Sequence, residues 1–109
     1  MKFDHIGLIS NTPKANEIWV EATKVWVTDY HNHPFKVEWL RFEEDSPVTG
    51  PVRERPHTAW EVDDIDKASE GMKVLLAPFD SGPAIVGFYE NPDGAVIEFI
   101  KYKTEPGNN

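Results

Sequence analysis

Blocks of alternating apolar and polar residues predict short strands separated by turns. In the first fifty residues, β-branched, aliphatic and aromatic side chains predict strands at 3–9, 25–28 and 36–42. Thr12 before Pro13 is typical of a helix start, so we expect a helix over 12–23. Residues 31–34 predict a turn, and 43–56, with three prolines and six charges, predict an exposed crossing loop.

The same order of elements is predicted again in the second half. Strands are expected at 57–62, 73–77, 84–90 and 95–102. A helix is expected over 65–71, because Asp63 and Asp64 precede it as caps and Gly71 ends it. Residues 91–94 predict a tight turn, and we expect a flexible tail at 104–109.

The two halves share local patterns that indicate an internal duplication. Residues 37–42 and 97–102 both run aliphatic, Glu, aromatic, aliphatic, basic, aromatic, and the helix starts at 14–17 and 67–70 also match. The offsets are 57 − 5 = 52 for a histidine near the start of each half, 67 − 14 = 53 and 98 − 38 = 60. The second half therefore carries seven or eight extra residues, about one short strand with its turn. Three matches in one order favour duplication over chance.

Composition narrows the possible partners. A chain of 109 residues that is 39% apolar, with 6 Phe, 3 Tyr and 4 Trp, predicts one folded domain, and we expect the tryptophans to build its core. A net charge of −8 argues against nucleic acid or an anionic membrane as a partner. With 0 Cys, disulfides and thiol chemistry are excluded, so any metal must be held by His and carboxylates. Charges directly after Met1 and the lack of a long apolar run lead us to expect a soluble cytoplasmic protein.

The strongest candidate site combines two histidines with two glutamates. Glu98 lies within the apolar stretch 95–100, where a carboxylate is costly to bury unless it is paired or binds a metal. Alternation places it on the same face as Val96 and Ile100. If the two halves pack about a pseudo-twofold axis, four residues meet at one point: His5, Glu38, His57 and Glu98. Such a set suits zinc, nickel, iron or manganese, although each residue taken alone is more often structural.

Two further pairs are weaker candidates. Arg53 and Arg55 are candidates for binding an anionic group of a substrate, with a solvated loop of alternating charge as the alternative. His31 and His33 have the spacing of a metal pair in a strand, but Pro34 favours a solvated turn. The chain has neither a glycine-rich phosphate loop nor a Gly-x-Ser-x-Gly elbow, which argues against nucleotide binding and serine catalysis.

Four segments resemble the vicinal-oxygen-chelate superfamily, which includes glyoxalases, bleomycin resistance proteins and dioxygenases. They are Phe-Asp-His-Ile-Gly-Leu at 3–8, Pro-His-Thr-Ala-Trp-Glu-Val-Asp-Asp at 56–64, Glu-Asn-Pro-Asp-Gly at 90–94 and Ala-Val-Ile-Glu-Phe at 95–99. The resemblance implies an α+β fold of two βαβββ modules, 1–50 and 51–103, whose curled mixed sheets surround a shared cleft. The first module is expected to be shortened by one strand, and 12–29 lacks the aromatic pair and Leu-Gly usual there.

The resemblance also implies a ligand set and a reaction class. The positions that hold a divalent ion in metal-dependent members correspond here to His5, Glu38, His57 and Glu98. We therefore expect a metal-dependent lyase or isomerase acting on a small oxygenated substrate, with Glu98 or Glu38 moving a proton next to a carbonyl. The alternatives are a metal-free protein that sequesters a small molecule and, ranked lower, a dioxygenase that uses two His and one Glu. A homodimer is expected, because two small curled sheets leave edges to cover.

Overall fold

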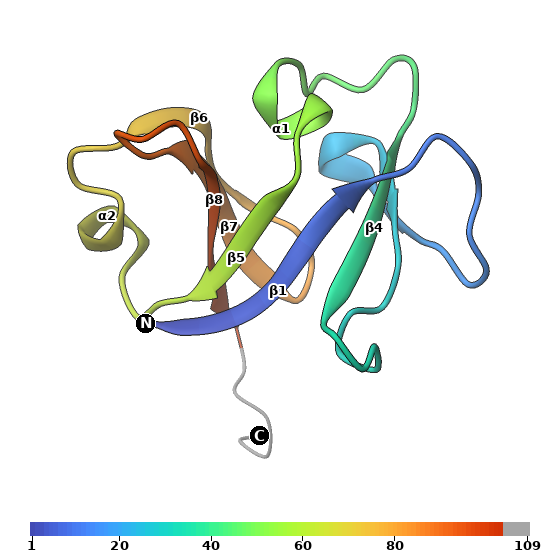
Figure 1. Ribbon diagram of the computed structural model, residues 1–109, viewed down its shortest axis with the longest axis horizontal. Helices are drawn as coiled ribbons and strands as arrows, with labels where there is room; N and C mark the ends of the chain where they lie inside the picture. The colour runs from blue at the N-terminus through green and yellow to red at the C-terminus, as the bar shows by residue number, and fades with distance from the viewer. Residues whose placement is uncertain (104–109) are drawn as a thin grey trace.

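The alternating stretches form the strands of one mixed sheet, which curls into a half-barrel in this computed structural model (Figure 1). The structure describes residues 1–103. In chain order the elements are β1 (Lys2–Ile9), β2 (Ile18–Val20), the 3-10 helix η1 (Glu21–Thr23), β3 (Val25–Val27), β4 (Val37–Phe42), α1 (Pro51–Glu54), β5 (His57–Glu61), α2 (Ile65–Ala68), β6 (Lys73–Asp80), β7 (Ala84–Glu90) and β8 (Val96–Tyr102). The fold is therefore rich in β-structure, with short helices, in agreement with the predicted curled mixed sheet.

The eight strands are ordered β2-β3-β4-β1-β5-β8-β7-β6. At the centre β1 and β5 run antiparallel, and each has a parallel neighbour on its other side, β4 and β8 respectively. The two parallel registers correspond, since Gly7 lies opposite Glu38 and Ala59 lies opposite Glu98. The differences, 59 − 7 = 52 and 98 − 38 = 60, are those of the sequence matches. Both glutamates thus occupy corresponding places in the sheet.

The helix predicted over 12–23 is wrong. The segment forms a loop, the edge strand β2 and the single turn η1. Asn16 takes a positive φ angle of 59°, which the interior of a continuous α-helix does not allow. Pairing of the apolar strand β2 with β3 outweighs the local helix signal at Thr12 and Pro13. The first half consequently has four strands like the second, so it lacks an α-helix rather than the strand that we expected to be missing.

Three other predicted boundaries also change. The predicted crossing loop contains one helical turn, α1, which begins at Pro51 because proline suits the first turn of a helix. The helix predicted over 65–71 is confirmed but ends at Ala68. The strand predicted over 73–77 extends to Asp80 and pairs with β7 at the edge of the sheet.

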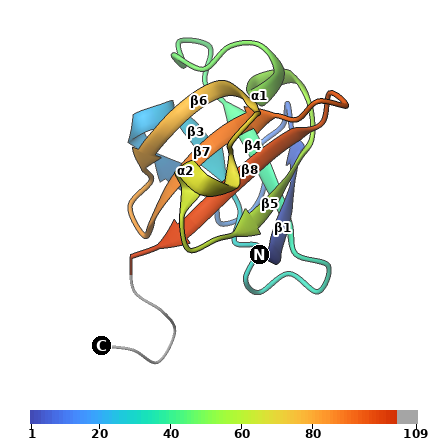
Figure 2. The same cartoon turned by 90° about the vertical axis from the view of Figure 1, so that its left-hand side faces the viewer.

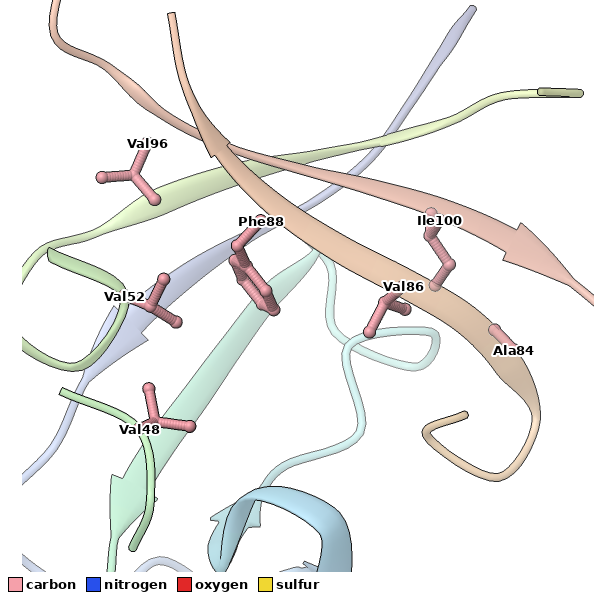
Figure 3. Close-up of a cluster of buried hydrophobic side chains, with 7 residues drawn as sticks. All are labelled: Val48, Val52, Ala84, Val86, Phe88, Val96 and Ile100. Carbon is pink, nitrogen blue, oxygen red and sulfur yellow. The ribbon is translucent and has the colours of Figure 1, made fainter. Parts of the chain in front are cut away.

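Apolar side chains pack on both faces of the sheet. Seven buried residues form the inner cluster (Figure 3): Val48, Val52, Ala84, Val86, Phe88, Val96 and Ile100. On the outer face α2 lies over β8 (Figure 2), where Ile65 packs with Val62, Tyr89 and Phe99. The expectation that the tryptophans build this core is met only in part: Trp60 packs against the outer cluster, but none of the four is fully buried and Trp19 is 37% exposed.

Two predictions concern the membrane and the C-terminal tail. Over residues 1–103, the structure contains no helix that is both long enough and apolar enough to cross a bilayer. The tail predicted at 104–109 lies outside the described residues.

Candidate metal centre

The antiparallel pair β1 and β5 positions both histidines. His57 lies opposite Gly7, and His5 lies opposite Ala59, so each imidazole faces one of the smallest side chains. A Cβ atom at Gly7 would lie 2.1 Å from Cε1 of His57, which means that the ring occupies the space of that side chain. The glycine therefore allows His57 to lie across the neighbouring strand.

A bulge in β1 brings Asp4 to the same side as His5. The register with β5 shifts between Phe3 and His5, so Asp4 is the extra residue. In a regular strand, consecutive side chains point to opposite faces. Because the bulge breaks this alternation, a carboxylate oxygen of Asp4 lies 2.6 Å from Nδ1 of His5.

The four predicted residues converge as a buried group. One ligand atom from each of His5, Glu38, His57 and Glu98 lies within 4.8 Å of all the others. Oε1 of Glu98 is 3.0 Å from Nε2 of His57 and 3.4 Å from Nε2 of His5. Oε1 of Glu38 is 3.4 Å from the same Nε2 of His5. Exposed fractions of 1–9% keep bulk water away from the cluster.

The histidine nitrogens test whether a metal fits. Within the described chain, Nε2 of His5 and both ring nitrogens of His57 are buried without a hydrogen-bond partner. The 3.0 Å approach of His57 to Glu98 is short but lacks the alignment of a hydrogen bond. Unpartnered buried nitrogens are costly, and a cation between them and the carboxylates would satisfy them. The donor set thus fits a borderline divalent ion, whose identity the residues do not fix.

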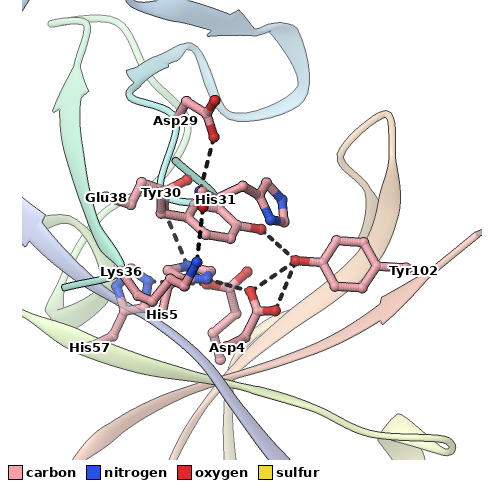
Figure 4. A network of polar contacts seen from close by, with 10 residues as sticks. Asp4, His5, Asp29, Tyr30, His31, Lys36, Glu38, His57 and Tyr102 are labelled. Atoms are coloured by element: carbon pink, nitrogen blue, oxygen red, sulfur yellow. Dashed lines mark hydrogen bonds and ion pairs between the residues drawn. The ribbon is translucent and has the colours of Figure 1, made fainter. Parts of the chain in front are cut away.

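Asp4, which accepts hydrogen bonds from a tyrosine hydroxyl, contacts His5 at Nδ1, the ring nitrogen that does not face the cluster (Figure 4). His5 donates its Nδ1–H to Asp4, so that in the neutral ring the Nε2 lone pair is directed at the cluster, the arrangement of metal-binding histidines. The Tyr102 hydroxyl donates to Asp4 at 2.9 Å and lies 2.7 Å from the Tyr30 hydroxyl, which must then be the donor. The ring of Tyr30 stacks on His5 with centroids 3.8 Å apart. These contacts fix both the tautomer and the orientation of the imidazole.

Charges within the cluster outweigh burial for two of its members. Burial lowers the pKa of His5, but Asp4, Glu38 and Glu98 together raise that pKa to about 11. Burial raises the pKa of Glu98, but His5 and His57 lower it to about 2. For Glu38 burial prevails over His5 and raises the pKa. Without a metal, the protonated His5 imidazole therefore compensates the negative charge of Glu98.

The cluster lies at the wall of an apolar cavity of about 210 Å³, lined by His5, Glu38 and Glu98 among other residues. Both edge strands of the sheet, β2 and β6, contribute to the lining through Trp19 and Phe79. Because the sheet is curled, both of its edge strands and the cluster line the same cavity. A small molecule in this cavity would contact the glutamates.

Of the other predicted residues, two arginines and two histidines, only His31 lines the cavity. Arg53 lies over the ring of Phe42, 5.7 Å from its centroid, and Arg55 is 3.4 Å from the Glu90 carboxylate. Neither arginine lines the cavity, so their role in substrate binding stays a prediction. His31 lines the cavity, whereas Nδ1 of His33 accepts a hydrogen bond from a backbone N–H within the turn.

Sequence reasoning missed four residues of the site. Gly7 carried a signal, since a glycine inside a strand often marks a close approach. Asp4, Tyr30 and Tyr102 carried none, because a bulge and a loop bring them to His5.

The comparisons with known proteins do not assign the site. No protein-family model matches the chain, and no curated protein matches it. The superfamily resemblance stays a prediction, and the chemistry of the site must be argued from its own geometry.

Proposed function

We propose that the chain is a metal-dependent lyase or isomerase of the vicinal-oxygen-chelate type that acts on a small oxygenated substrate. The observation that carries the proposal is the cluster itself. Two histidines with unpartnered nitrogens and two buried glutamates meet at the wall of an apolar cavity. A structural ion pair has no need of a second histidine whose ring nitrogens are both left without hydrogen bonds.

The sheet supports two βαβββ-like modules, of which the first lacks its helix. Adding 52 to both members of the pair Gly7 and His5 gives Ala59 and His57, and these four residues pair across β1 and β5. Each half therefore supplies one histidine and one glutamate to the cluster. Convergence of equivalent residues is expected where two duplicated halves meet about a pseudo-twofold axis.

Each member of the cluster has a role in the proposed reaction. His5 and His57 would hold the ion through Nε2, and both glutamates would contribute carboxylate oxygens. A divalent ion supplies a Lewis acid that polarises a carbonyl or enediolate oxygen. Glu98 is contacted by both histidines and Glu38 by only one, so Glu38 is the less constrained carboxylate. Glu38 is the better candidate to move a proton at the carbon next to the carbonyl.

Metal analysis tests the proposal directly. Protein purified without added metal is treated with a chelator and titrated with Zn²⁺, Ni²⁺, Fe²⁺ and Mn²⁺ by calorimetry. We expect one ion per chain for at least one of these metals. His57→Ala should abolish binding, and His33→Ala, which removes a histidine from the turn, should leave it unchanged. A folded wild-type protein that binds none of the four metals would refute the proposal.

One observation favours a second function, a metal-free protein that binds a small molecule. In the metal-free cluster the proton on His5 already compensates Glu98, and His5 binds Asp4 at 2.6 Å. The cavity would then hold its ligand through apolar contacts alone. The same titration separates the two functions, because this one requires no metal.

A further inference from the structure

The chemistry of the cavity lining restricts what the proposed enzyme can bind. Apolar side chains form most of the wall, including Leu40, Phe42, Val86 and Phe88. The acidic groups in the lining are Glu38 and Glu98 in the cluster and Asp29 in the loop before Tyr30. Within residues 1–103, no Lys or Arg lines the cavity.

Two cations that are adjacent in sequence to lining residues, Arg41 and Lys24, are engaged in ion pairs. Arg41 donates to both carboxylate oxygens of Glu17 at 3.0 and 2.7 Å. Lys24 pairs with Asp45 at 2.8 Å. Such contacts are charge-assisted and leave these side chains directed at their own partners.

A bound divalent ion would not make the lining of the cavity positively charged. The ionised carboxylates of Glu38 and Glu98 carry two negative charges, which match the two positive charges of the ion. The loaded cluster would therefore offer no excess positive charge to a phosphate or carboxylate elsewhere on a ligand. An anionic group in the cavity would lose part of its hydration with no Lys or Arg to pair with, and it would face Asp29.

We infer that the cavity selects a small neutral substrate with an apolar tail and rejects anionic ones. The inference rests on the proposed function for the oxygen-binding end and on the cavity lining for the tail. The substrate class is a ketone, aldehyde or hydroxycarbonyl compound with an aliphatic or aromatic tail. Phosphorylated, nucleotide-linked and peptide-thiol substrates are excluded. A volume of about 210 Å³ is below the roughly 300–1,000 Å³ of pockets for drug-sized ligands, so the substrate is small.

Matched ligands test the selection with and without metal. In metal-free protein, binding of p-toluamide and 4-carbamoylbenzoate, which differ by a methyl and a carboxylate, is compared by NMR titration. In metal-loaded protein, the pair is 4-methylbenzohydroxamate and 4-carboxybenzohydroxamate, which present two vicinal oxygens. We expect the methyl compound to bind at least tenfold more tightly in both forms. Lengthening alkyl hydroxamates should raise affinity by about fourfold per buried CH₂.

A charge placed in the wall should reverse the preference. Ser81 lines the cavity directly after β6, where its hydroxyl donates to the Ala84 carbonyl, so Ser81→Lys introduces a cation into the wall at the cost of that hydrogen bond. We expect this variant to bind the carboxylates more tightly than the wild type does. Ser81→Gln, a neutral side chain of similar reach, should retain the wild-type preference. If Ser81→Lys does not fold, Asp29→Asn provides a second test. Removal of the Asp29 charge should reduce the difference in affinity between the neutral and the anionic member of each ligand pair.

The outcomes separate this inference from the proposed function. Metal binding with equal affinity for both members of each pair would overturn the inference and leave the proposed function standing. Loss of metal binding with the neutral preference intact in metal-free protein would overturn the proposed function and support the cavity selection. Tighter binding of 4-carbamoylbenzoate by wild-type protein would also overturn the inference.

Discussion

The two buried glutamates should respond in opposite ways when their charge is removed from the metal-free protein. Glu98 is held by two histidines and has a pKa lowered to about 2. Glu38 has a pKa raised by burial, which prevails over His5. Glu98→Gln should therefore destabilise the metal-free fold, and Glu38→Gln should leave it unchanged or stabilise it. Both variants keep the shape of the side chain, so packing of the inner face is preserved.

The size of the Glu98 effect follows from its pKa. The difference between the ordinary pKa of 4.5 and about 2, at about 1.4 kcal/mol per unit, corresponds to about 3–4 kcal/mol of stability at neutral pH. Because the folded pKa is the lower one, this contribution is present above pH 4.5 and is lost as the pH falls towards 2. At about 4–8 °C per kcal/mol, Glu98→Gln should lower the Tm by about 12–32 °C.

The assay is thermal unfolding of chelator-treated protein at pH 7, with and without metal. Metal at one hundred times its Kd should stabilise the wild type by about 2.7 kcal/mol. Both Gln variants should lose most of this increase, since each removes a carboxylate ligand. Glu44→Gln, at an exposed position, is the control and should match the wild type in both states.

Two results would refute this reasoning. An undiminished metal-induced increase in Tm in both variants would show that neither glutamate is a ligand. A loss of stability in metal-free Glu38→Gln as large as in Glu98→Gln would show that the two carboxylates do not differ in their electrostatic environments. If Glu98→Gln does not fold, Glu38→Gln still tests metal binding.

Three further predictions concern the groups around the histidines. The pKa of His5 is raised from 6.5 to about 11, so its contribution to folding stability is complete below pH 6.5 and is lost as the pH rises towards 11. The free energy of unfolding of the metal-free protein, measured with urea, should therefore fall by about 1.4 kcal/mol per pH unit between these values. With metal bound, the fall should be less steep. Asp4→Asn should weaken metal binding about 10–100-fold by calorimetry, whereas Asp45→Asn at the surface should not. Gly7→Ala should displace the His57 ring and abolish metal binding, and a wild-type affinity would show that the ring has room to move.

The convergence of the cluster could be predicted because strand geometry converts spacing into position. Repeated hexapeptides put Glu38 and Glu98 at equivalent places, and the structure confirms equivalent registers opposite Gly7 and Ala59. Alternation also placed Glu98 correctly on the face of the inner cluster, whose members include Ile100. These inferences needed only periodicity and one internal comparison.

What could not be predicted depends on contacts between distant segments. The local signals of a helix at 12–23 were outweighed by pairing of β2 with β3. Tyr102 reaches Asp4 across 98 positions of the chain, and no local pattern reports such a contact. The bulge at Asp4 breaks the alternation on which strand predictions rely. The support of His5 therefore became visible only once the chain was folded.

The metal-free cluster explains how the proposed metal site can fold without an ion. Two buried carboxylates without compensation would strongly destabilise the sheet. Protonated His5, whose Nδ1 contacts Asp4 and whose Nε2 faces Glu98, supplies the missing positive charge. A divalent ion must displace a proton of this ring, because a ligating imidazole is neutral. Metal binding should therefore release a proton from His5. The Asp4 contact that stabilises the charged histidine would also orient the neutral imidazole for the metal.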